Sequence, residues 1–492
     1  MKKIIYILCM VAWVSFYSCD ETLDIDPESE RTSQYKKYKT EDEVRAAIIG
    51  CYNGLQGPMN TEWMLTELRS DNAVQGSPTS TSTQNIELNQ LDLFSLLPTH
   101  PRVYDYWLAT YHNISRVNTA LNSIELIKDE NERNRLKAEI SFIRAYHYFN
   151  LVRLFGPVFI ETEIVTPQQA RLIDRSSVED VYTLITGDLK FALATTSLPD
   201  KVSKDNLGRV GKHAVRTLLA KVYLTRGELG EARPLLETVR TSGDHHLLPY
   251  EQVFAVTNEM NDEIIFAVRY KAGGYGIGSP FANRFAPSQS GDKIVNGDGS
   301  GWNFPSYDFM GNAYDVGDKR KEVTVDVFGT GDWPKNYNKK YLSQVQITYD
   351  AENDWPVLRY ADVLLMLAEI INEQEGHANA LPLINQVRAE HGELGGLTMV
   401  NSQQDCRIAI EEERRVEFAF ENHRFFDLVR TGRALEVLNN QIFGLDNAFY
   451  NRYRTDKPDP AKIVQEWQLL LPIPQREIDA NNKIVITQNY GY

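Results

Sequence analysis

Apolar residues recur at helical spacing through most of this chain, and this pattern restricts the fold more than any other feature. Between Glu132 and Phe155, one helical face would carry a run of apolar side chains and a single histidine: Leu136, Ile140, Ile143, His147, Leu151 and Leu154. A spacing of three and four residues is typical of an amphipathic α-helix. Gly156 and Pro157 then end the pattern. The sequence therefore predicts a mostly α-helical protein.

Further helices are predicted on both sides of the middle of the chain. They are expected at residues 41–55, 103–127, 178–195, 211–226, 358–375, 378–391 and 404–429. Two helix pairs share alanines twelve residues apart with a glycine between them: Ala220, Gly227 and Ala232, then Ala368, Gly376 and Ala380. Small residues let antiparallel helices pack closely, as in tetratricopeptide-type repeats. Antiparallel pairs are therefore expected at 211–240 and 358–391, and stacked pairs would form a curved scaffold.

Residues 270–345 interrupt the helical pattern. These 76 residues contain 12 of the 30 glycines and 13 of the 52 aromatic residues (25 Tyr, 20 Phe and 7 Trp). Irregular segments of this length are uncommon in compact domains unless they carry function. The final stretch, 469–492, is expected to be extended, because Pro472 and Pro474 exclude a helix.

The N-terminus has the features of an export signal. Lys2 and Lys3 precede an apolar stretch of about a dozen residues, which is too short to span a bilayer and fits a secretory signal. Ser18 then precedes Cys19, a pattern that resembles the lipobox of bacterial lipoproteins. Residues 1–18 are therefore predicted to be removed, Cys19 to be acylated, and residues 19–40 to form a tether. A plain secretory signal with a chance cysteine is the alternative.

Composition excludes several functions. The 67 acidic and 52 basic side chains leave a formal net charge of −15, so the chain has no excess of cations for general nucleic-acid binding. The cysteines are too few and too scattered for a disulfide framework or a zinc site, and Cys51 and Cys406 are expected to be buried thiols. Apart from the export signal, no apolar run suggests a transmembrane helix.

No catalytic motif is found in the sequence. The chain has no GxSxG, HExxH or Walker A pattern and no Ser/His/Asp spacing. Gly297, Gly299 and Gly301 alternate with polar residues, but as a calcium loop starting at Asn296 the segment would place Tyr307 where a bidentate glutamate is required. We therefore expect neither an enzyme, nor a metal site, nor a cofactor.

Four segments in order resemble one known family. They read AEISFIRAYHYFNLV (138–152) followed by FGPV (155–158), PVLRYADVLL (356–365), ERRVEF (413–418) with HRFFDLVR (423–430), and LPIPQREI (471–478). Together with the lipobox, they resemble the SusD/RagB family of outer-membrane nutrient-binding lipoproteins over nearly the whole mature chain. Acidic Asp20 and Glu21 after the cysteine also resemble the surface-export signal of Bacteroidetes lipoproteins.

The resemblance implies a function and a partner. It implies a mostly α-helical SusD-like fold with an N-terminal helical part (41–270) and a C-terminal part (271–492), lipid-anchored in the outer membrane. It further implies a SusC-like TonB-dependent transporter as partner and an oligosaccharide as cargo. A peptide binder or a repeat scaffold without a ligand site remains the alternative. The shared motifs themselves are interpreted as scaffold: clustered Arg and Glu as a structural ion network, with Glu411 and Arg415 paired, and His147 as a hydrogen-bonded core residue.

Sugar binding requires flat aromatic side chains beside a few fixed polar groups. The irregular segment supplies five candidates on glycine-rich loops: Tyr275, Trp302, Tyr307, Trp333 and Tyr337. Trp302 is the leading candidate, because it follows three alternating glycines and is hard to bury there. Asp71 and Asn72 are predicted to hydrogen-bond sugar hydroxyls. Packing beneath a long loop is the alternative for each aromatic residue, and Trp355 is expected in the core.

Overall fold

The N-terminal helices begin at local signals that the sequence contains. The computed structural model describes residues 38–76, 81–329, 335–443, 464–481 and 483–492. Helix α3 (Glu41–Asn53) starts with a capping box, in which Thr40 accepts from the Glu43 N–H and the Glu43 side chain accepts from the Thr40 N–H. Helix α7 (Glu130–Phe155) starts at a cap by Asp129 and ends at Gly156, whose φ of 71° favours glycine. The predicted export signal, Cys19 and most of the tether lie outside the described residues.

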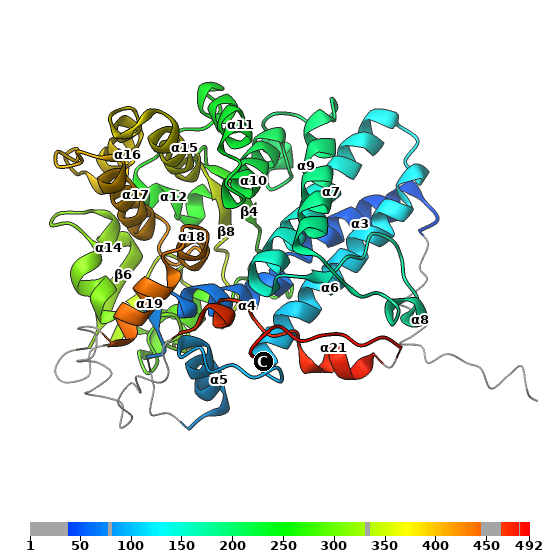
Figure 1. Ribbon diagram of the computed structural model, residues 1–492, viewed down its shortest axis with the longest axis horizontal. Helices are drawn as coiled ribbons and strands as arrows, with labels where there is room; N and C mark the ends of the chain where they lie inside the picture. The colour runs from blue at the N-terminus through cyan, green and yellow to red at the C-terminus, as the bar shows by residue number, and fades with distance from the viewer. Residues whose placement is uncertain (1–37, 77–80, 330–334, 444–463, 482) are drawn as a thin grey trace, which may run out of the picture.

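The described residues are mostly helical, as predicted (Figure 1). The other long helices are α4 (Gln56–Thr66), α5 (Thr83–Asp92), α6 (Pro101–Asn122), α9 (Val178–Ala194), α10 (Lys212–Thr225), α11 (Leu229–Thr241), α15 (Tyr360–Glu375), α16 (His377–Gly392), α17 (Gln403–Glu417) and α19 (Ala434–Phe443). The short ones are α8 (Pro167–Ala170), α12 (Tyr250–Val253), α13 (Phe281–Phe285), α14 (Arg320–Thr324), α18 (Arg424–Arg430) and α21 (Gln475–Ala480).

The two predicted hairpins are present and pack against each other. Helices α10 and α11 are joined by three residues around Gly227, and α15 and α16 by Gly376 alone, so each pair is antiparallel. Ala220, Ala232, Ala368 and Ala380 are fully buried. Helix α11 of the first hairpin contacts α15 of the second, and both hairpins lie along the upper edge in Figure 1. This confirms the reading of the small residues as positions of close helix contact.

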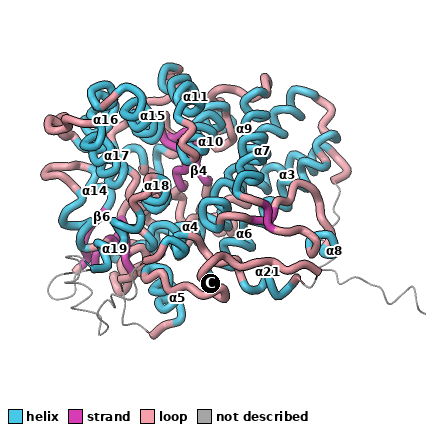
Figure 2. Tube along the Cα trace, in the orientation of Figure 1, coloured by secondary structure: helices cyan, strands magenta, loops and turns pink. Residues whose placement is uncertain are grey.

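Strands are short and occur in pairs among the described residues (Figure 2). The antiparallel pairs are β1 (Ala73–Val74) with β5 (Phe304–Pro305), β2 (Val158–Phe159) with β3 (Arg175–Ser176), β4 (Ile264–Val268) with β8 (Trp355–Arg359), and β6 (Val325–Phe328) with β7 (Lys335–Asn338). Elements within the described part of 270–345 are at most five residues long, as the sequence predicted. The β1–β5 pair fastens this segment to the N-terminal half.

Two helix predictions need correction. The single helix expected at 404–429 is divided into α17 and α18, because Phe420 and Asn422 adopt left-handed backbone conformations (φ 64° and 67°). The turn brings the Glu421 carboxylate to Arg359 and the Asn422 N–H to Glu67 Oε1 (2.7 Å). The extended stretch 469–492 contains the six-residue helix α21, since a proline directly before a helix does not interrupt its hydrogen bonds.

The core residues predicted from the sequence are buried. His147 is 1% exposed and its Nε2 lies 2.8 Å from Asn113 Nδ2, while burial lowers the pKa of the imidazole to about 3. Cys51 and Cys406 are buried thiols. Trp355 is 1% exposed and stacks on Tyr341 with ring centroids 4.4 Å apart. One hydrophobic core runs from Val44 to Ile486 and so includes both halves of the chain.

The predicted ion network is buried in the interior, where Glu263 of the N-terminal part meets charged residues of the C-terminal part. Arg359, at the end of β8, donates to Glu263 Oε1 (2.7 Å), Glu417 Oε1 (2.9 Å) and both oxygens of Glu421 (2.7 and 2.9 Å). Arg320 pairs with Glu417 (3.2 Å), and the ammonium group of Lys340 lies 2.8 Å from Glu421. All six side chains are at most 1% exposed. The charges compensate one another, which confirms the interpretation of the third motif as a structural network.

The i,i+4 pair predicted between Glu411 and Arg415 is absent. Glu411 lies 3.1 Å from Arg433 and 3.5 Å from Arg424. Arg415 instead pairs with Asp71 (3.0 Å), which the fold brings in from the N-terminal half. A buried partner replaces the local one because isolated pairs on a helix surface stabilise only by ~0.2–0.5 kcal/mol.

Replacing Arg359 by methionine is expected to lower the free energy of unfolding by ~3–5 kcal/mol or to prevent folding, because three buried carboxylates lose their shared cation. Denaturant unfolding monitored by circular dichroism measures the loss. The matched control is Arg407→Met, which removes an exposed pair with Glu373 and should cost less than ~1 kcal/mol. Equal, small losses for both variants would contradict a structural role for the network.

Candidate functional site

Trp302 lies on a loop that is fastened to helix α13. The Trp302 N–H donates to the Arg284 carbonyl oxygen (2.9 Å), and the Gly301 N–H donates to the Ala286 carbonyl oxygen (2.8 Å). The indole is half-buried and stacks on fully buried Trp63 of α4, with ring centroids 6.1 Å apart and planes 28° apart. The Trp302 side chain therefore has one supported face, as a rigid aromatic platform requires.

Glycine is needed in the loop before Trp302 for steric reasons. A Cβ atom at Gly299 would lie 2.1 Å from the Ala286 carbonyl oxygen. The carboxylate of Asp298, the residue before Gly299, accepts from the N–H groups of Gly291 (3.0 Å) and Gly299 (2.8 Å). Its carboxylate thus holds the loop together through backbone donors, and this geometry does not favour a calcium ligand.

Two exposed tyrosines lie on loops next to the Trp302 loop. Tyr275 is 72% exposed and Tyr349 is 47% exposed. The Tyr349 hydroxyl lies 3.0 Å from Ser300 Oγ, two residues before Trp302. The Tyr275 loop is tied to the Tyr349 loop by Asp350, whose Oδ2 accepts from the N–H groups of Gly273 and Gly274 (2.8 Å each). Three aromatic side chains therefore belong to one cluster of neighbouring loops, which we call the aromatic loop cluster (residues 273–302 and 347–350).

Tyr349 is not among the site residues predicted from the sequence, because it lies four residues beyond the glycine-rich segment 270–345. The signal was available, since Tyr349 is an aromatic residue within a polar run that ends at Asp354. Strain provides a second, structural signal. Among the residues that the structure describes, nine non-glycine residues have positive φ, and four of them lie in or next to the aromatic loop cluster: Gln289, Asp298, Asn303 and Tyr349. Residues held in such conformations gather at functional sites.

The structure does not place Asp71 and Asn72 at a ligand surface, which corrects the prediction. Asp71 is 5% exposed and accepts two bonds from Arg424, at 2.7 and 2.9 Å. Although burial opposes it, the charges of Arg415 and Arg424 hold the pKa of this carboxyl well below its usual range. Asn72 is fully buried, and its Oδ1 accepts from Arg415 Nε (3.1 Å). Both side chains join the two halves of the chain instead of facing a sugar.

Of the remaining aromatic candidates, Tyr337 is a packing residue, which also corrects the prediction. Tyr337, on β7, is 5% exposed and its hydroxyl donates to Asp326 (3.2 Å). Tyr307 is half-buried and packs against Val74 and Phe304. Tyr337 is held in the interior because β7 is paired with β6, whereas Tyr307 stays a candidate. Trp333 lies outside the described residues.

Glu263, His391 and Glu417 form a buried group whose possible ligand atoms all lie within 4.8 Å of one another. Arg359 already binds both glutamates, through Nη1. Although burial opposes it, the charges of Glu417 and Glu263 raise the pKa of His391 to about 10, so the imidazole is protonated. A protonated imidazole has no lone pair for a metal ion. The three residues therefore belong to the ion network.

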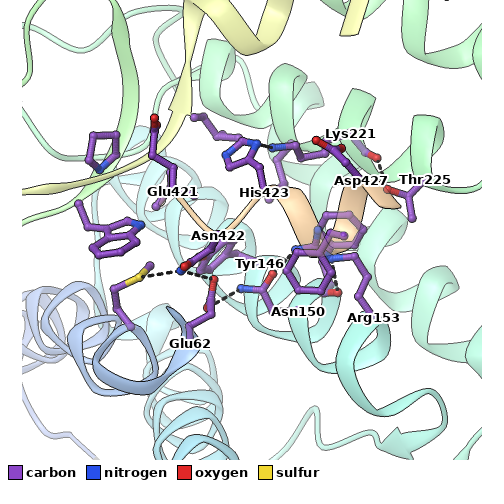
Figure 3. Close-up of a pocket in the computed structure, with 18 of the residues that line it drawn as sticks. Glu62, Tyr146, Asn150, Arg153, Lys221, Thr225, Glu421, Asn422, His423 and Asp427 are labelled. Carbon is purple, nitrogen blue, oxygen red and sulfur yellow. Dashed lines mark hydrogen bonds between the residues drawn. The ribbon is translucent and has the colours of Figure 1, made fainter. Parts of the chain in front are cut away.

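An interior pocket lies between α4, α7, α10 and α18 (Figure 3). Its cavity volume is about 50 Å³, which suits a few water molecules and is too small for a sugar ring. Glu62 accepts from Asn150 Nδ2 (3.1 Å) and Asn422 Nδ2 (3.3 Å) across this pocket, as Figure 3 shows. Burial raises the pKa of Glu62 to about 7, although the charge of Arg153 opposes the shift. Polar side chains from both halves of the chain therefore line this pocket and hydrogen-bond to one another.

Two family models match the chain. The model described as "SusD family" matches residues 320–492, and the one described as "Starch-binding associating with outer membrane" matches residues 21–224. A SusD-like protein of Formosa agariphila is 26% identical, and the match covers 97% of each chain. The chain belongs to the SusD/RagB family.

Solved structures share the fold. A laminarin-binding SusD-like protein matches with a TM-score of 0.77 and 26% identity, over 92% of this chain and 100% of the other. Surface glycan-binding protein A from Bacteroides thetaiotaomicron, in complex with laminarihexaose, matches with the same TM-score and coverage at 22% identity. These two relatives are described by what they bind, and neither is described as an enzyme.

Glu62→Gln is expected to change how stability depends on pH. Between about pH 4.5 and 7 folded Glu62 keeps a proton that the unfolded chain has lost, so the parent loses up to ~3 kcal/mol as pH rises through this window. Glutamine is neutral at every pH and avoids this loss. Urea unfolding at pH 5 and pH 8 measures this. The free energy of unfolding of the variant, relative to that of the parent, should be higher at pH 8 than at pH 5. The exposed control Glu163→Gln should follow the parent, and identical pH profiles for Glu62→Gln and parent would refute the assignment.

Proposed function

We propose that this protein is a cell-surface glycan-binding lipoprotein that captures oligosaccharides and delivers them to a SusC-like TonB-dependent transporter. One observation carries the proposal, namely the aromatic loop cluster with its half-buried Trp302 and exposed Tyr275 and Tyr349. Sugar rings present apolar C–H faces that stack on aromatic side chains. Trp302 is suited to such stacking because Trp63 supports it from below.

The relatives support the same function. The laminarin-binding relative has the same fold over nearly the whole of this chain, so laminarin oligosaccharides are the first neutral ligand to test. Membership of the SusD/RagB family supports the role in uptake, and one family model is described as associating with the outer membrane.

Attachment to the membrane is proposed to occur through lipid on Cys19, which lies outside the described residues. Within the described part of the chain, no helix is both long and apolar enough to cross a bilayer. Several acyl chains on one cysteine anchor a protein stably, whereas one chain gives only marginal binding. A lipid anchor would hold the helical body at the outer membrane, where the proposed transporter partner resides.

A peptide binder is the second candidate, and one cavity favours it. The cavity has a volume of about 390 Å³ and lies among α10, α11, α15, α17 and α18. Apolar Leu224, Leu229 and Ile408 line it together with charged side chains. The charges are already paired within the protein, as in Arg430 with Glu369 and Arg407 with Glu373. A peptide would have to compete with these pairs, so we place the glycan function first.

Trp302→Ala is expected to weaken oligosaccharide binding about tenfold or more, equivalent to ~1.4 kcal/mol, because the stacking surface at its subsite is lost. Calorimetric titration with laminarin oligosaccharides and with ligands from a glycan-array screen measures the change. Truncation also uncovers Trp63, so we expect the free energy of unfolding to fall by ~1–2 kcal/mol. The titrations are therefore run well below the melting temperature of the variant.

Tyr490→Ala is the matched control, because Tyr490 is an 87% exposed aromatic residue on the C-terminal segment. It should bind like the parent, whereas Tyr275→Ala and Tyr349→Ala should bind more weakly. If the folded Trp302→Ala variant bound oligosaccharides with unchanged affinity, Trp302 would be a packing residue and not part of the binding site. Binding of peptides and of no glycan would favour the second candidate.

Cys19→Ser is expected to release the protein from the membrane fraction, because the acylated side chain would be missing. Fractionation of cells that produce parent and variant measures the release. Mass spectrometry of the membrane-extracted parent should identify an acylated Cys19 as its first residue. An unmodified Cys19, or cleavage at another position, would contradict lipid anchoring.

A further inference from the structure

Arg284 is a half-buried cation beside Trp302 that lacks an acidic partner. Its guanidinium carbon lies 5.7 Å from the centroid of the Trp302 ring. Its Nη1 donates to the Asn60 carbonyl oxygen (2.9 Å), which also accepts from Trp63 Nε1 (3.2 Å). Among the described residues, no carboxylate oxygen lies within 4.0 Å of the guanidinium. The side chain is therefore held close to the Trp302 ring, and no carboxylate of the described residues compensates its charge.

This situation differs from that of other buried arginines. Several of them bind one or more carboxylates: Arg320, Arg359, Arg414, Arg424 and Arg430. Among the described residues, Arg69, Arg153 and Arg175 have no such partner either. Arg69 and Arg175 each donate to three oxygen atoms and Arg153 donates to two, whereas the guanidinium of Arg284 donates to one. Burial lowers the pKa of Arg284, the phenol of Tyr270 offsets part of this, and the nearby cation of Arg102 lowers it further. Burying a cation without an anion is costly, so a site that keeps one has a use for it.

A second cation lies close to the Trp302 loop. The Lys335 ammonium group donates to the Ser288 carbonyl oxygen (2.6 Å) and to Gln289 Oε1 (3.1 Å). A Cβ atom at Gly301 would lie 3.1 Å from Ser288 N, so Ser288 abuts the residue that precedes Trp302. No carboxylate oxygen of the described residues lies within 4.0 Å of the Lys335 ammonium group.

The acidic groups of the loop do not neutralise these cations. Asp298 accepts from the N–H groups of Gly291 and Gly299, and Asp292 Oδ1 accepts from the Gly297 N–H (2.9 Å). Both carboxylates are therefore occupied in holding the loop. Arg284 and Lys335 are free to face an anion supplied from outside.

We propose that the Trp302 site binds an acidic sugar, whose ring stacks on the indole while its carboxylate or sulfate pairs with Arg284. A planar guanidinium matches either anion with two parallel hydrogen bonds. Lys335 adds a second positive charge for the neighbouring residue of the glycan. This inference rests on the proposed glycan-binding function and narrows its substrate class from sugars in general to sugars that carry a negative charge.

The test compares three probes on the same protein by calorimetric titration: oligogalacturonate for carboxylates, a sulfated galactan oligosaccharide for sulfates, and laminarin oligosaccharides as the neutral reference. At least one acidic probe should bind tenfold or more tightly than the neutral one. Raising the salt concentration from 50 to 500 mM should weaken acidic binding alone, because salt screens exposed charges. Stronger binding by one acidic probe identifies the anion.

Arg284→Gln should reduce acidic binding at least tenfold and leave neutral binding within twofold. Arg284→Lys, which keeps the charge and loses the planar fork, should fall between the parent and Arg284→Gln. Arg171→Gln, on an exposed arginine outside the aromatic loop cluster, is the matched control and should bind like the parent. Thermal melts show that each variant is folded.

The outcomes separate the inference from the proposed function. Tighter binding of the neutral probe, or equal acidic binding by folded Arg284→Gln and parent, overturns the acidic-sugar inference and leaves glycan binding intact. A folded parent that binds neither these probes nor any glycan of an array overturns the proposed function and the inference with it. Acidic preference that disappears in Arg284→Gln and persists in Arg171→Gln supports the inference.

Discussion

The structure depends on a buried set of charges that can be satisfied only when distant segments meet. Arg359 ends β8, Glu263 precedes β4, and Glu417 and Glu421 flank the turn after α17. Removing any one partner would leave charge in a dry interior, which costs several kcal/mol. Isolated hairpins and strand pairs could pack in many arrangements, whereas all the ion pairs of this network form together in one arrangement of these elements. We therefore regard it as the interaction that fixes how the C-terminal helices, the β4–β8 pair and the turn before α18 are placed together.

A rigid interior allows the functional side of the molecule to consist of loops. Short strand pairs and backbone hydrogen bonds hold the aromatic loop cluster. There, residues with positive φ and the exposed Tyr275 and Tyr349 lie near Trp302, which Trp63 supports. The scaffold and the site thus use charge differently. Carboxylates compensate several of the buried arginines of the scaffold, while Arg284 lies 5.7 Å from the centroid of the Trp302 ring with no carboxylate of the described residues close to it. That contrast is the physical basis for separating structural arginines from one that is available to a ligand.

Particular residues show how far a single sequence leads toward the site. Trp302 was identified because alternating glycines leave little room to bury an indole, and the structure leaves it half-buried on Trp63. Asp71 could not be recognised as an interior residue, because its partners Arg415 and Arg424 lie more than 340 positions away in the chain. Tyr349 lies four residues beyond the glycine-rich segment 270–345, and its hydrogen bond with Ser300 is what places it beside that segment. Contacts between loops leave no periodic trace in a sequence.

The sequence by itself determined the helical class, the two hairpins with their small contact residues, the irregular middle segment and the family. These properties follow from local spacing, from residue size and from motifs that can be read along the chain. The tertiary structure decided which charged residues are buried together, where the helix expected at 404–429 breaks, and which aromatic side chains reach the surface. Burial and ion pairing depend on partners that are remote in sequence, so Asp71 became a scaffold residue and Arg284 was left beside Trp302 without an anion.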